Sequence, residues 1–382
     1  MVQIDRRLFS HFDFLLLALS LLLPILGLIV LYSAGHDAGY AKTFTWPPIT
    51  IHSQAFLRQA VFIFLGLGCL LAGVVISPSF ISRMSYWIYA FCLLLLICVE
   101  LYGMVAKGSQ RWLSMGGFHI QPAEPMKLAL VFVLAKCLSR NPPSRGGYRL
   151  REAALPLLLI IMPVALIVAQ PDLGTSVAVL AIGLSMVLFM GIRLKTLLML
   201  CLPVLIGVYP AWHLLHPYQK KRIQVLLNPE IEPLGSGYQI QQSKIAVGSG
   251  KLLGKGFMRG TQSQLEFLPE HTTDFVFSVL AEEWGFMGSI LVLVLYLVLL
   301  YRMAVLVLRS KDLFAALTIV GVASLIFAHT IINVGMVVGL LPVVGLPLPL
   351  FSYGGSSVVS CMFAIGVVLG FDMRRLLFIG KG

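Results

Sequence analysis

The chain has 382 residues, of which 58% are hydrophobic and 12% are charged, whereas soluble domains average about 45–50% apolar and about 25% charged residues. No soluble core buries such a surplus, so the composition and the mean hydropathy of +0.92 exclude cytosolic enzymes, disordered chains and collagen-like chains and indicate a polytopic membrane protein. The net charge of +12 comes mostly from basic residues between apolar runs, which favours anionic lipids as their partners over nucleic acid.

A membrane-spanning helix needs roughly 20 apolar residues, and we find ten candidate runs, of which the fourth and fifth are short. They lie near residues 13–33, 55–76, 82–104, 123–139, 153–169, 174–191, 194–212, 275–301, 312–338 and 351–372. The predicted fold class is therefore an all-α polytopic membrane protein with about ten transmembrane helices. We expect it to form a single integral membrane domain over residues 1–382.

The basic residues predict which side of the membrane each connection faces. Ten spans place both termini on one side, and the segments of that side hold 16 of the 28 Lys and Arg residues. Of the 12 on the other side, seven lie in one long loop, from about 213 to 274, and long loops escape the positive-inside rule. We therefore predict cytoplasmic termini and one large extracytoplasmic loop between helices 7 and 8.

Ionisable residues that border a span are costly and usually functional, and the first of them lie ahead of the fourth run. Arg111 and Trp112 precede a Gln121-to-Lys127 segment whose two prolines suit the first turn of a helix. Glu124 and Lys127 are three residues apart and so share one face of that turn. Two interpretations remain open: a salt bridge that allows the helix to insert, or a lysine that contacts a phosphate.

A Gln170-to-Thr175 segment forms a predicted tight outer hairpin in which Asp172 is well placed as a helix N-cap. The alternative is a functional carboxylate, and the sequence does not choose between the two.

The segment Glu266 to Asp274 leads into the eighth span and places Asp274 at its outer mouth. Glu282 lies eight residues on, about 80° round a helix, and so is expected to face a similar direction. Glu283 points nearly opposite and is expected to meet another helix. An acidic group beside apolar surface suits a general base, although Asp274 is also placed to cap the helix.

The segment Leu348 to Ser357 precedes the last span and contains Pro349 and a Gly-Gly pair. Irregular backbone at membrane depth is tolerated only against protein or a wet cavity. The segment is therefore either a polar cavity wall or a kinked helix start.

A glycine-rich stretch, Gly248 to Gly256, resembles a phosphate-binding loop but lacks its spacing, because Lys255 is followed by Gly256 instead of Ser or Thr. It could still offer backbone N–H groups, Lys251 and Lys255 to a lipid-linked phosphate. The pair His213 and His216 lacks a third metal ligand, so we predict no metal site there.

These clusters, in this order, resemble the SEDS family of shape, elongation, division and sporulation proteins over nearly the whole chain. The residues that carry the resemblance are Arg111-Trp112, Gln121 to Lys127, Gln170 to Thr175, Gln241-Gln242-Ser243 with Gly248-Ser249-Gly250, Leu268-Pro269-Glu270 with Asp274, and Ser352 to Ser357. The stretch from Gly260 to Glu270, with Ala281 to Gly285, is similar to the RodA branch more than to the division branch, FtsW.

The resemblance implies a ten-helix peptidoglycan glycosyltransferase that polymerises lipid II at the outer face of the bacterial inner membrane, during cell elongation and rod-shape maintenance. It also implies work with a class B penicillin-binding protein and other elongation-complex proteins. The essential motif aspartate of the family falls on Asp274. The substrate-binding residues expected are Arg111, Trp112, Gln121, Glu124, Lys127, Asp172, Lys251, Glu270, Glu282 and Ser356.

Two positions depart from the family's usual pattern, Pro-Glu-x-His-Thr-Asp. Thr272 occupies the histidine position and His271 the variable one, so we give no histidine a catalytic role. Val344 stands where a threonine is usual. A divalent cation such as Mg²⁺ or Mn²⁺ remains open, because no carboxylate cluster in the sequence decides it. The alternatives are a flippase for a lipid-linked precursor, a non-catalytic scaffold, or the FtsW-like branch.

Overall fold

A computed structural model describes residues 12–35, 44–46, 49–51, 54–106, 109–115, 118–143, 146–202, 213, 217–233 and 235–375. Within these ranges, eight helices are long and apolar enough to cross a membrane. They are α2 (Phe14–Ala34), α3 (Gln54–Val75), α4 (Pro78–Tyr102), α6 (Leu150–Ala169), α7 (Leu173–Met190), α12 (Val276–Arg309), α13 (Leu313–Val337) and α14 (Gly355–Met373). Each coincides with one of the ten predicted runs.

The other two predicted runs have different outcomes. Residues 123–139 form helix α5 (Ala123–Arg140), which carries Glu124, Lys127, Lys136 and Arg140 and is therefore less apolar than the eight. It is buried along almost its whole length, so neighbouring helices replace lipid around it. Of the run 194–212, residues 194–202 are helical, and 203–212 lie outside the described residues.

The structure also contains small antiparallel sheets, which the all-α prediction did not include. Strands β1 (Phe44–Trp46) and β2 (Ile49–Ile51) pair, and β4 (Ser109–Met115) lies between β3 (Met104–Ala106) and β5 (Phe118–Ile120). The strands are only three to seven residues long. Such short strands leave little periodic signal in a sequence.

The long predicted loop packs on the helix bundle. It contains α9 (Pro217–Leu227), the 3₁₀-helix η1 (Pro229–Ile231), α10 (Ser236–Ser249) and the short α11 (Thr261–Gln264). Helix α10 contacts α12 and α13, and the Ser243 hydroxyl donates to the Val337 carbonyl oxygen at 2.6 Å. The loop is therefore seated on α12 and α13 near the start of α12 and the end of α13.

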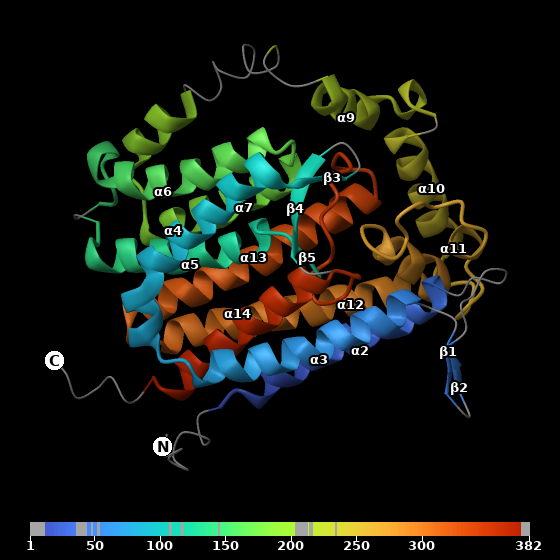
Figure 1. The fold of residues 1–382 in the computed structure, drawn as a ribbon, viewed down its shortest axis with the longest axis horizontal. Coiled ribbons are helices and arrows are strands. Elements are labelled where there is room, and N and C mark those ends of the chain that lie inside the picture. Colours follow the sequence, from blue (N-terminus) through green and yellow to red (C-terminus); the bar gives the residue numbers. More distant parts are fainter. Residues whose placement is uncertain are drawn as a thin grey trace.

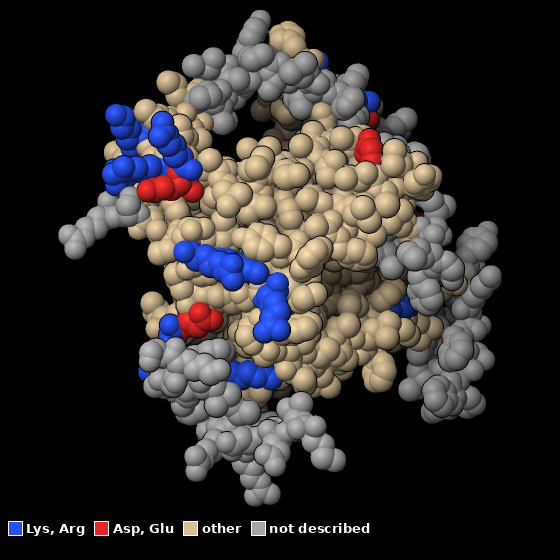
Figure 2. Space-filling model, turned by 60° about the vertical axis from the view of Figure 1, so that its left-hand side comes forward, with Lys and Arg blue, Asp and Glu red and all other residues tan. Residues whose placement is uncertain are grey.

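The two ends of the bundle differ in composition (Figure 1). At one end, which we call the termini end, α2 begins and α14 ends, and Asp13 forms an ion pair with Arg302 of α12. Figure 2 shows Lys and Arg gathered on this face with few acidic residues. The opposite end, which we call the loop end, carries α9, α10 and α11. Polar segments thus cover both ends of an apolar bundle.

Helices α3 and α14 pack closely because glycines let their backbones approach. A Cβ atom on Gly366 would lie 2.1 Å from the Leu70 carbonyl oxygen, and one on Gly73 would lie 2.7 Å from that of Phe363. Backbone contact of this kind is typical of helices that associate inside a membrane. These contacts join the C-terminal halves of α3 and α14.

Candidate active site

Asp274 lies at the loop end, in a turn immediately before α12. The backbone N–H groups of Asp274 and Phe275 donate to the Glu270 carbonyl oxygen at 3.1 and 3.2 Å. The helix begins at Val276 with Phe275 as its N-cap residue, whose side chain makes no cap hydrogen bond. Asp274 is half-buried, and the N-cap interpretation of its carboxylate is wrong, because the turn places it one residue too early.

Two segments from elsewhere in the chain meet Asp274. The buried Asn333 of α13 donates from Nδ2 to the Asp274 carbonyl oxygen at 2.8 Å and to the Leu346 carbonyl oxygen at 2.7 Å. The Asp274 carboxylate oxygen Oδ2 lies 3.3 Å from the position of a Cβ on Gly345. Asn333 therefore joins the turn before α12 to the segment before α14.

Lys127 occupies the interior next to this network. Its side chain is 1% exposed, and Nζ donates to Glu124 Oε1 at 2.8 Å. This confirms that Glu124 and Lys127 share one face of the first turn of α5. On its other side, Nζ lies 3.1 Å from His329 Nε2 of α13. Since an ammonium group only donates hydrogen bonds, the His329 ring nitrogen accepts here.

His329 and Asn333 are not among the residues predicted from the sequence, although a signal for them exists. They are four residues apart in an apolar span and therefore share one helical face, and polar residues inside a span mark functional sites by default. One face of α13 thus contacts Lys127 through His329 and the Asp274 turn through Asn333. The two clusters that the sequence predicted separately belong to one network.

Arg111 belongs to a separate set of polar contacts at the start of α7. It lies on β4, and its Nη2 donates to the Pro171 carbonyl oxygen at 2.9 Å, while Nε lies 3.4 Å from Asp172 Oδ2. The Asp172 side chain accepts from the Thr175 backbone N–H at 3.1 Å, which confirms that it caps α7. The buried carboxylate of Asp172 therefore both caps a helix and orients Arg111.

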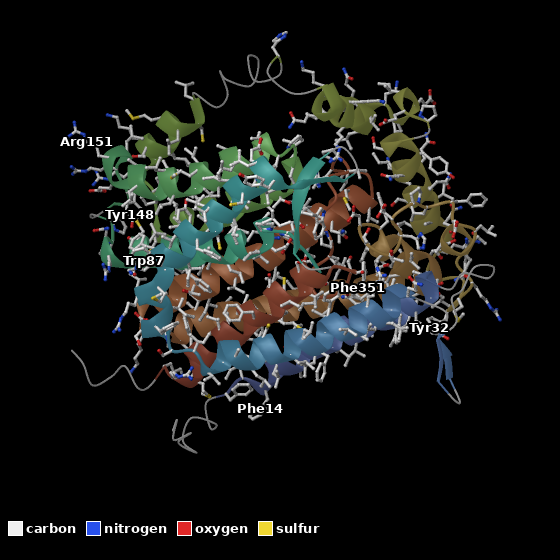
Figure 3. The ribbon with its side chains drawn as sticks, viewed as in Figure 1. Phe14, Tyr32, Trp87, Tyr148, Arg151 and Phe351 are labelled. Carbon is white, nitrogen blue, oxygen red and sulfur yellow. The ribbon has the colours of Figure 1, made fainter. Side chains whose placement is uncertain are left out.

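The segment before α14 has the irregular backbone that the prolines predicted, and it is buried against protein. Gln59 of α3 donates from Nε2 to the Ser352 carbonyl oxygen at 3.0 Å and accepts from the Gly354 N–H at 3.2 Å. The Tyr353 N–H donates to the Thr272 carbonyl oxygen at 3.1 Å. Figure 3 shows Phe351 inside the bundle. This segment therefore packs against the Asp274 turn.

Comparisons of the sequence and the fold with known proteins identify the family. A family model described as "Cell cycle protein", for FtsW, RodA and SpoVE, matches residues 13–376. This chain belongs to that family. Peptidoglycan glycosyltransferase MrdB of Escherichia coli strain K12 is 38% identical over 369 residues, covering 96% of this chain and 94% of the relative. Stage V sporulation protein E of Bacillus subtilis strain 168 is 38% identical over 368 residues, covering 94% and 96%.

Solved structures of the family have the same fold. A chain from a peptidoglycan synthase complex, solved to describe the structural coordination of polymerization and crosslinking, has a TM-score of 0.77 and 33% identity, covering 95% of this chain and 98% of that one. The crystal structure of the rod shape determining protein RodA of Thermus thermophilus has a TM-score of 0.69 and 30% identity, covering 95% and 97%.

The remaining residues that the sequence predicts to bind substrate occupy different surroundings. Trp112 follows Arg111 on β4 and is half-buried, as are Gln121, before α5, and Ser356, in the first turn of α14. Glu270 Oε2 accepts from the Thr273 hydroxyl at 3.1 Å, in the turn that holds Asp274. Lys251 is exposed. Their binding roles stay predictions.

Glu282 does not face the direction of Asp274, so that expectation is wrong. The helical periodicity of α12 does not extend back to Asp274, because the helix begins at Val276. Glu282 Oε1 instead accepts from Lys255 Nζ at 2.6 Å and from the Thr261 N–H at 2.9 Å. Its buried carboxylate anchors the long loop. Glu283 accepts from the Ser33 hydroxyl of α2, which confirms that it meets another helix.

The backbone N–H groups at the C-terminal end of the glycine-rich stretch are not available to bind a phosphate. The N–H groups of Gly254, Lys255 and Gly256 donate within the protein, to the carbonyl oxygens of Gly250, Glu282 and Glu283. The Lys255 ammonium is likewise engaged by Glu282.

His271, which departs from the family pattern, has structural contacts. Its ring nitrogens lie 2.8 Å from the Leu268 carbonyl oxygen and 3.0 Å from that of Ala34. The ring therefore ties the turn before α12 to the end of α2.

The described residues contain no group of three or more His, Cys, Asp or Glu side chains that would hold a metal ion. Of the pair first considered, His213 is described and exposed, while His216 lies outside the described residues.

Proposed function

We propose that this chain is a peptidoglycan glycosyltransferase that polymerises lipid II into glycan strands. The observation that carries the proposal is full-length membership of a family whose curated relatives are named for this activity. The proposed location of that activity is the network around Asp274, Asn333 and Lys127. We assign the elongation branch because MrdB and RodA relatives from several bacteria match over nearly the whole chain.

The proposal includes an orientation in the bacterial inner membrane. About ten spans, both termini in the cytoplasm and an extracytoplasmic loop from about 213 to 274 are supported by the basic face at the termini end. In this orientation, one integral membrane domain places Asp274 and Arg111 at the outer surface. Both substrates have tails in the bilayer and sugar heads outside, so the heads reach these groups.

The proposed reaction is displacement with inversion. Asp274 takes the proton of the acceptor hydroxyl on the GlcNAc of lipid II. The hydroxyl oxygen bonds to C1 of the MurNAc at the end of the growing strand, and the bond to undecaprenyl pyrophosphate breaks with its electron pair. General base catalysis contributes about 10²–10⁴-fold to the rate. The leaving pyrophosphate carries most of the developing negative charge, so cationic groups that stabilise it should contribute at least as much.

Arg111 is the better placed of the two candidate cations for the pyrophosphate. Its side chain is 18% exposed and its Nε is oriented by Asp172, whereas the Lys127 ammonium is enclosed by Glu124 and His329. We therefore propose that Arg111 contacts phosphate and that Lys127 sets the electrostatic potential of the site from beneath. Trp112, Gln121, Glu270 and Ser356 complete the proposed substrate contacts.

The proposed partner is a class B penicillin-binding protein that crosslinks the strands, together with other proteins of the elongation complex. The support is the structural likeness to a chain of a peptidoglycan synthase complex in which polymerization and crosslinking are coordinated. A flippase is the alternative, because it would also need polar groups within a bundle of spans.

The test reconstitutes the purified chain with its cognate transpeptidase in liposomes and supplies labelled lipid II. A gel then resolves glycan products from the wild type, Asp274→Asn and Glu230→Gln, an exposed acid of the same loop. We expect polymer from the wild type and Glu230→Gln and none from Asp274→Asn. Absence of polymer from the wild type would refute the enzyme, and abundant polymer from Asp274→Asn would refute the base. A lipid II translocation assay on the same liposomes identifies a flippase.

A further inference from the structure

Helix α12 is broken near its outer end, and part of the long loop fills the break. Gly285 has φ +68° and ψ −162°, so the helical hydrogen bonds are interrupted there. The N–H groups of Lys255 and Gly256 donate to the carbonyl oxygens of Glu282 and Glu283 at 3.0 and 2.9 Å. Loop residues 250–257, which we call the wedge, thus satisfy carbonyls that the break leaves free.

The wedge also accepts hydrogen bonds from the far side of the break. The N–H groups of Phe286 and Met287 donate to the Lys251 and Leu252 carbonyl oxygens at 2.9 and 3.1 Å. Broken backbone within a membrane needs such partners, because lipid offers none. Glycines make the contact close: a Cβ on Gly254 would lie 2.1 Å from the Glu283 carbonyl oxygen.

The length of α2 places this break relative to the bilayer. Near its start, Asp13 pairs with Arg302 of α12, and near its end Ser33 donates to Glu283 of α12. Twenty residues separate Asp13 from Ser33, which corresponds to about 30 Å of helix. The hydrocarbon core of a bilayer is also about 30 Å thick, so Glu283 lies at the outer boundary of that core if Asp13 lies at the inner one.

The exposure of side chains along α12 supports the same level. From Arg302, which pairs with Asp13, back to Phe286 the helix rises about 24 Å. Large apolar side chains of α12 become exposed from Phe286 onward, whereas residues 276–283 are buried in protein. The lipid-facing part of α12 therefore starts at the break.

The wedge exposes apolar side chains at this level. Leu253 is 77% exposed, and Leu252 and Phe257 are also exposed. An open hollow of about 390 Å³ lies between the wedge and α12, lined mainly by apolar residues and by Glu283 at one side: Leu253, Phe257, Glu283, Trp284, Met287, Gly288 and Leu291. The basic residues Lys251 and Arg259 are exposed at the margins of the wedge. Apolar side chains flanked by cations match the acyl chains and phosphates of a phospholipid.

We propose that the wedge is inserted into the outer leaflet, with Leu253 and Phe257 among the acyl chains of phospholipids and Lys251 and Arg259 at their phosphates. An acyl chain occupies the hollow beside Trp284. Because Glu282 holds Lys255 and Thr261, this insertion fixes the height of the long loop above the bilayer. The insertion depends on the break and the exposed apolar residues, and only the choice of leaflet rests on the proposed orientation.

The test measures the depth of position 253 in the full-length chain. An environment-sensitive fluorescent amino acid replaces Leu253 by nonsense suppression, which avoids the six native cysteines. A matched variant carries the same probe at Leu227 of α9, which is 83% exposed in the same long loop. Both variants are placed in nanodiscs of phosphatidylethanolamine and phosphatidylglycerol, with or without mid-chain brominated lipid, and are titrated with iodide.

We expect brominated lipid to quench the probe at 253 at least twofold while iodide quenches it weakly, and the reverse at 227. Equal iodide quenching at both positions, without bromine quenching at 253, would place the wedge in water and overturn the proposal. Quenching of 253 by neither agent would place it against protein and also overturn it. Monodisperse elution establishes folding, and a probe at Phe257 serves if the 253 variant fails to fold. None of these outcomes depends on glycan synthesis.

Discussion

The side chain of Asn333 donates a hydrogen bond of 2.8 Å to the main-chain carbonyl oxygen of Asp274. Because the same Nδ2 also donates to Leu346 at 2.7 Å, one buried amide holds two segments that carry no regular structure. The position of the proposed base therefore depends on a residue of α13 that lies 59 positions away in sequence.

Asn333→Leu should lower the rate of glycan polymerisation at least tenfold. The substitution leaves two main-chain acceptors without their donor, each at a cost of about 1–3 kcal/mol, and the turn that carries Asp274 loses its support. We expect kcat to fall while KM for lipid II changes little, because Asn333 positions the base and does not touch substrate in this arrangement.

Thr330→Val is the control on the same helix. The Thr330 hydroxyl donates only to the Ile326 carbonyl oxygen of its own helix, so its loss should leave the rate near that of the wild type. A full rate from Asn333→Leu, with Thr330→Val unchanged, would show that the Asp274 turn needs no such support.

The buried pair Glu124 and Lys127 should show strong energetic coupling. Removing one partner of a buried pair leaves an uncompensated charge and typically costs about 3–5 kcal/mol. We expect Glu124→Gln and Lys127→Met each to lower the thermal stability, and the double variant to be less destabilised than the two single changes together. Thermal unfolding in one detergent measures this cycle. Additive effects would argue that the ammonium is compensated by other groups.

Two glycines at the end of α10 should respond oppositely to alanine. A Cβ on Gly250 would lie 1.9 Å from the Ala281 carbonyl oxygen, whereas a Cβ on Gly248 meets nothing within 4 Å. Gly250→Ala must therefore push the loop away from α12 and should cost about 1–3 kcal/mol or more. Gly248→Ala should stabilise by about 0.5–1 kcal/mol. Thermal unfolding of the two variants decides, and equal effects would contradict the close packing.

The long loop should carry a small pH-dependent stabilisation from Glu232. A hydrogen bond from Lys221 and another from Ser236 lower the pKa of Glu232 below its ordinary value of 4.5, and Lys221 Nζ lies 2.7 Å from Oε1. A carboxyl with a lowered folded-state pKa contributes stability above its unfolded pKa, and that contribution disappears as the pH falls through the folded pKa.

Glu232→Gln measures that contribution. Both partners are partly exposed, so the variant should lose only about 0.5 kcal/mol at pH 7. The difference from the wild type should vanish as the pH falls from about 4.5 through the lowered pKa. A difference that stays constant over this range, measured by thermal unfolding, would assign the effect to packing instead of charge.

The membrane class, most of the helices and the polar clusters at their ends follow from the amino-acid sequence alone. These features depend on local signals: apolar runs of spanning length, prolines in a first helical turn, and an aspartate before Leu173 that caps α7. The pair Glu124 and Lys127 could be placed on one face because helical periodicity holds within one turn.

The contacts that join those clusters and hold the loop become visible only in the folded chain. His329 and Asn333 link Lys127 to the Asp274 turn across helices, and such contacts carry no local pattern in sequence. The break at Gly285 and the contact of Glu282 with the long loop were not predicted for the same reason. The partners that stabilise them lie in the long loop, in an earlier segment of the chain. Periodicity describes a helix only while the helix continues, and here long-range hydrogen bonds decide where it begins and breaks.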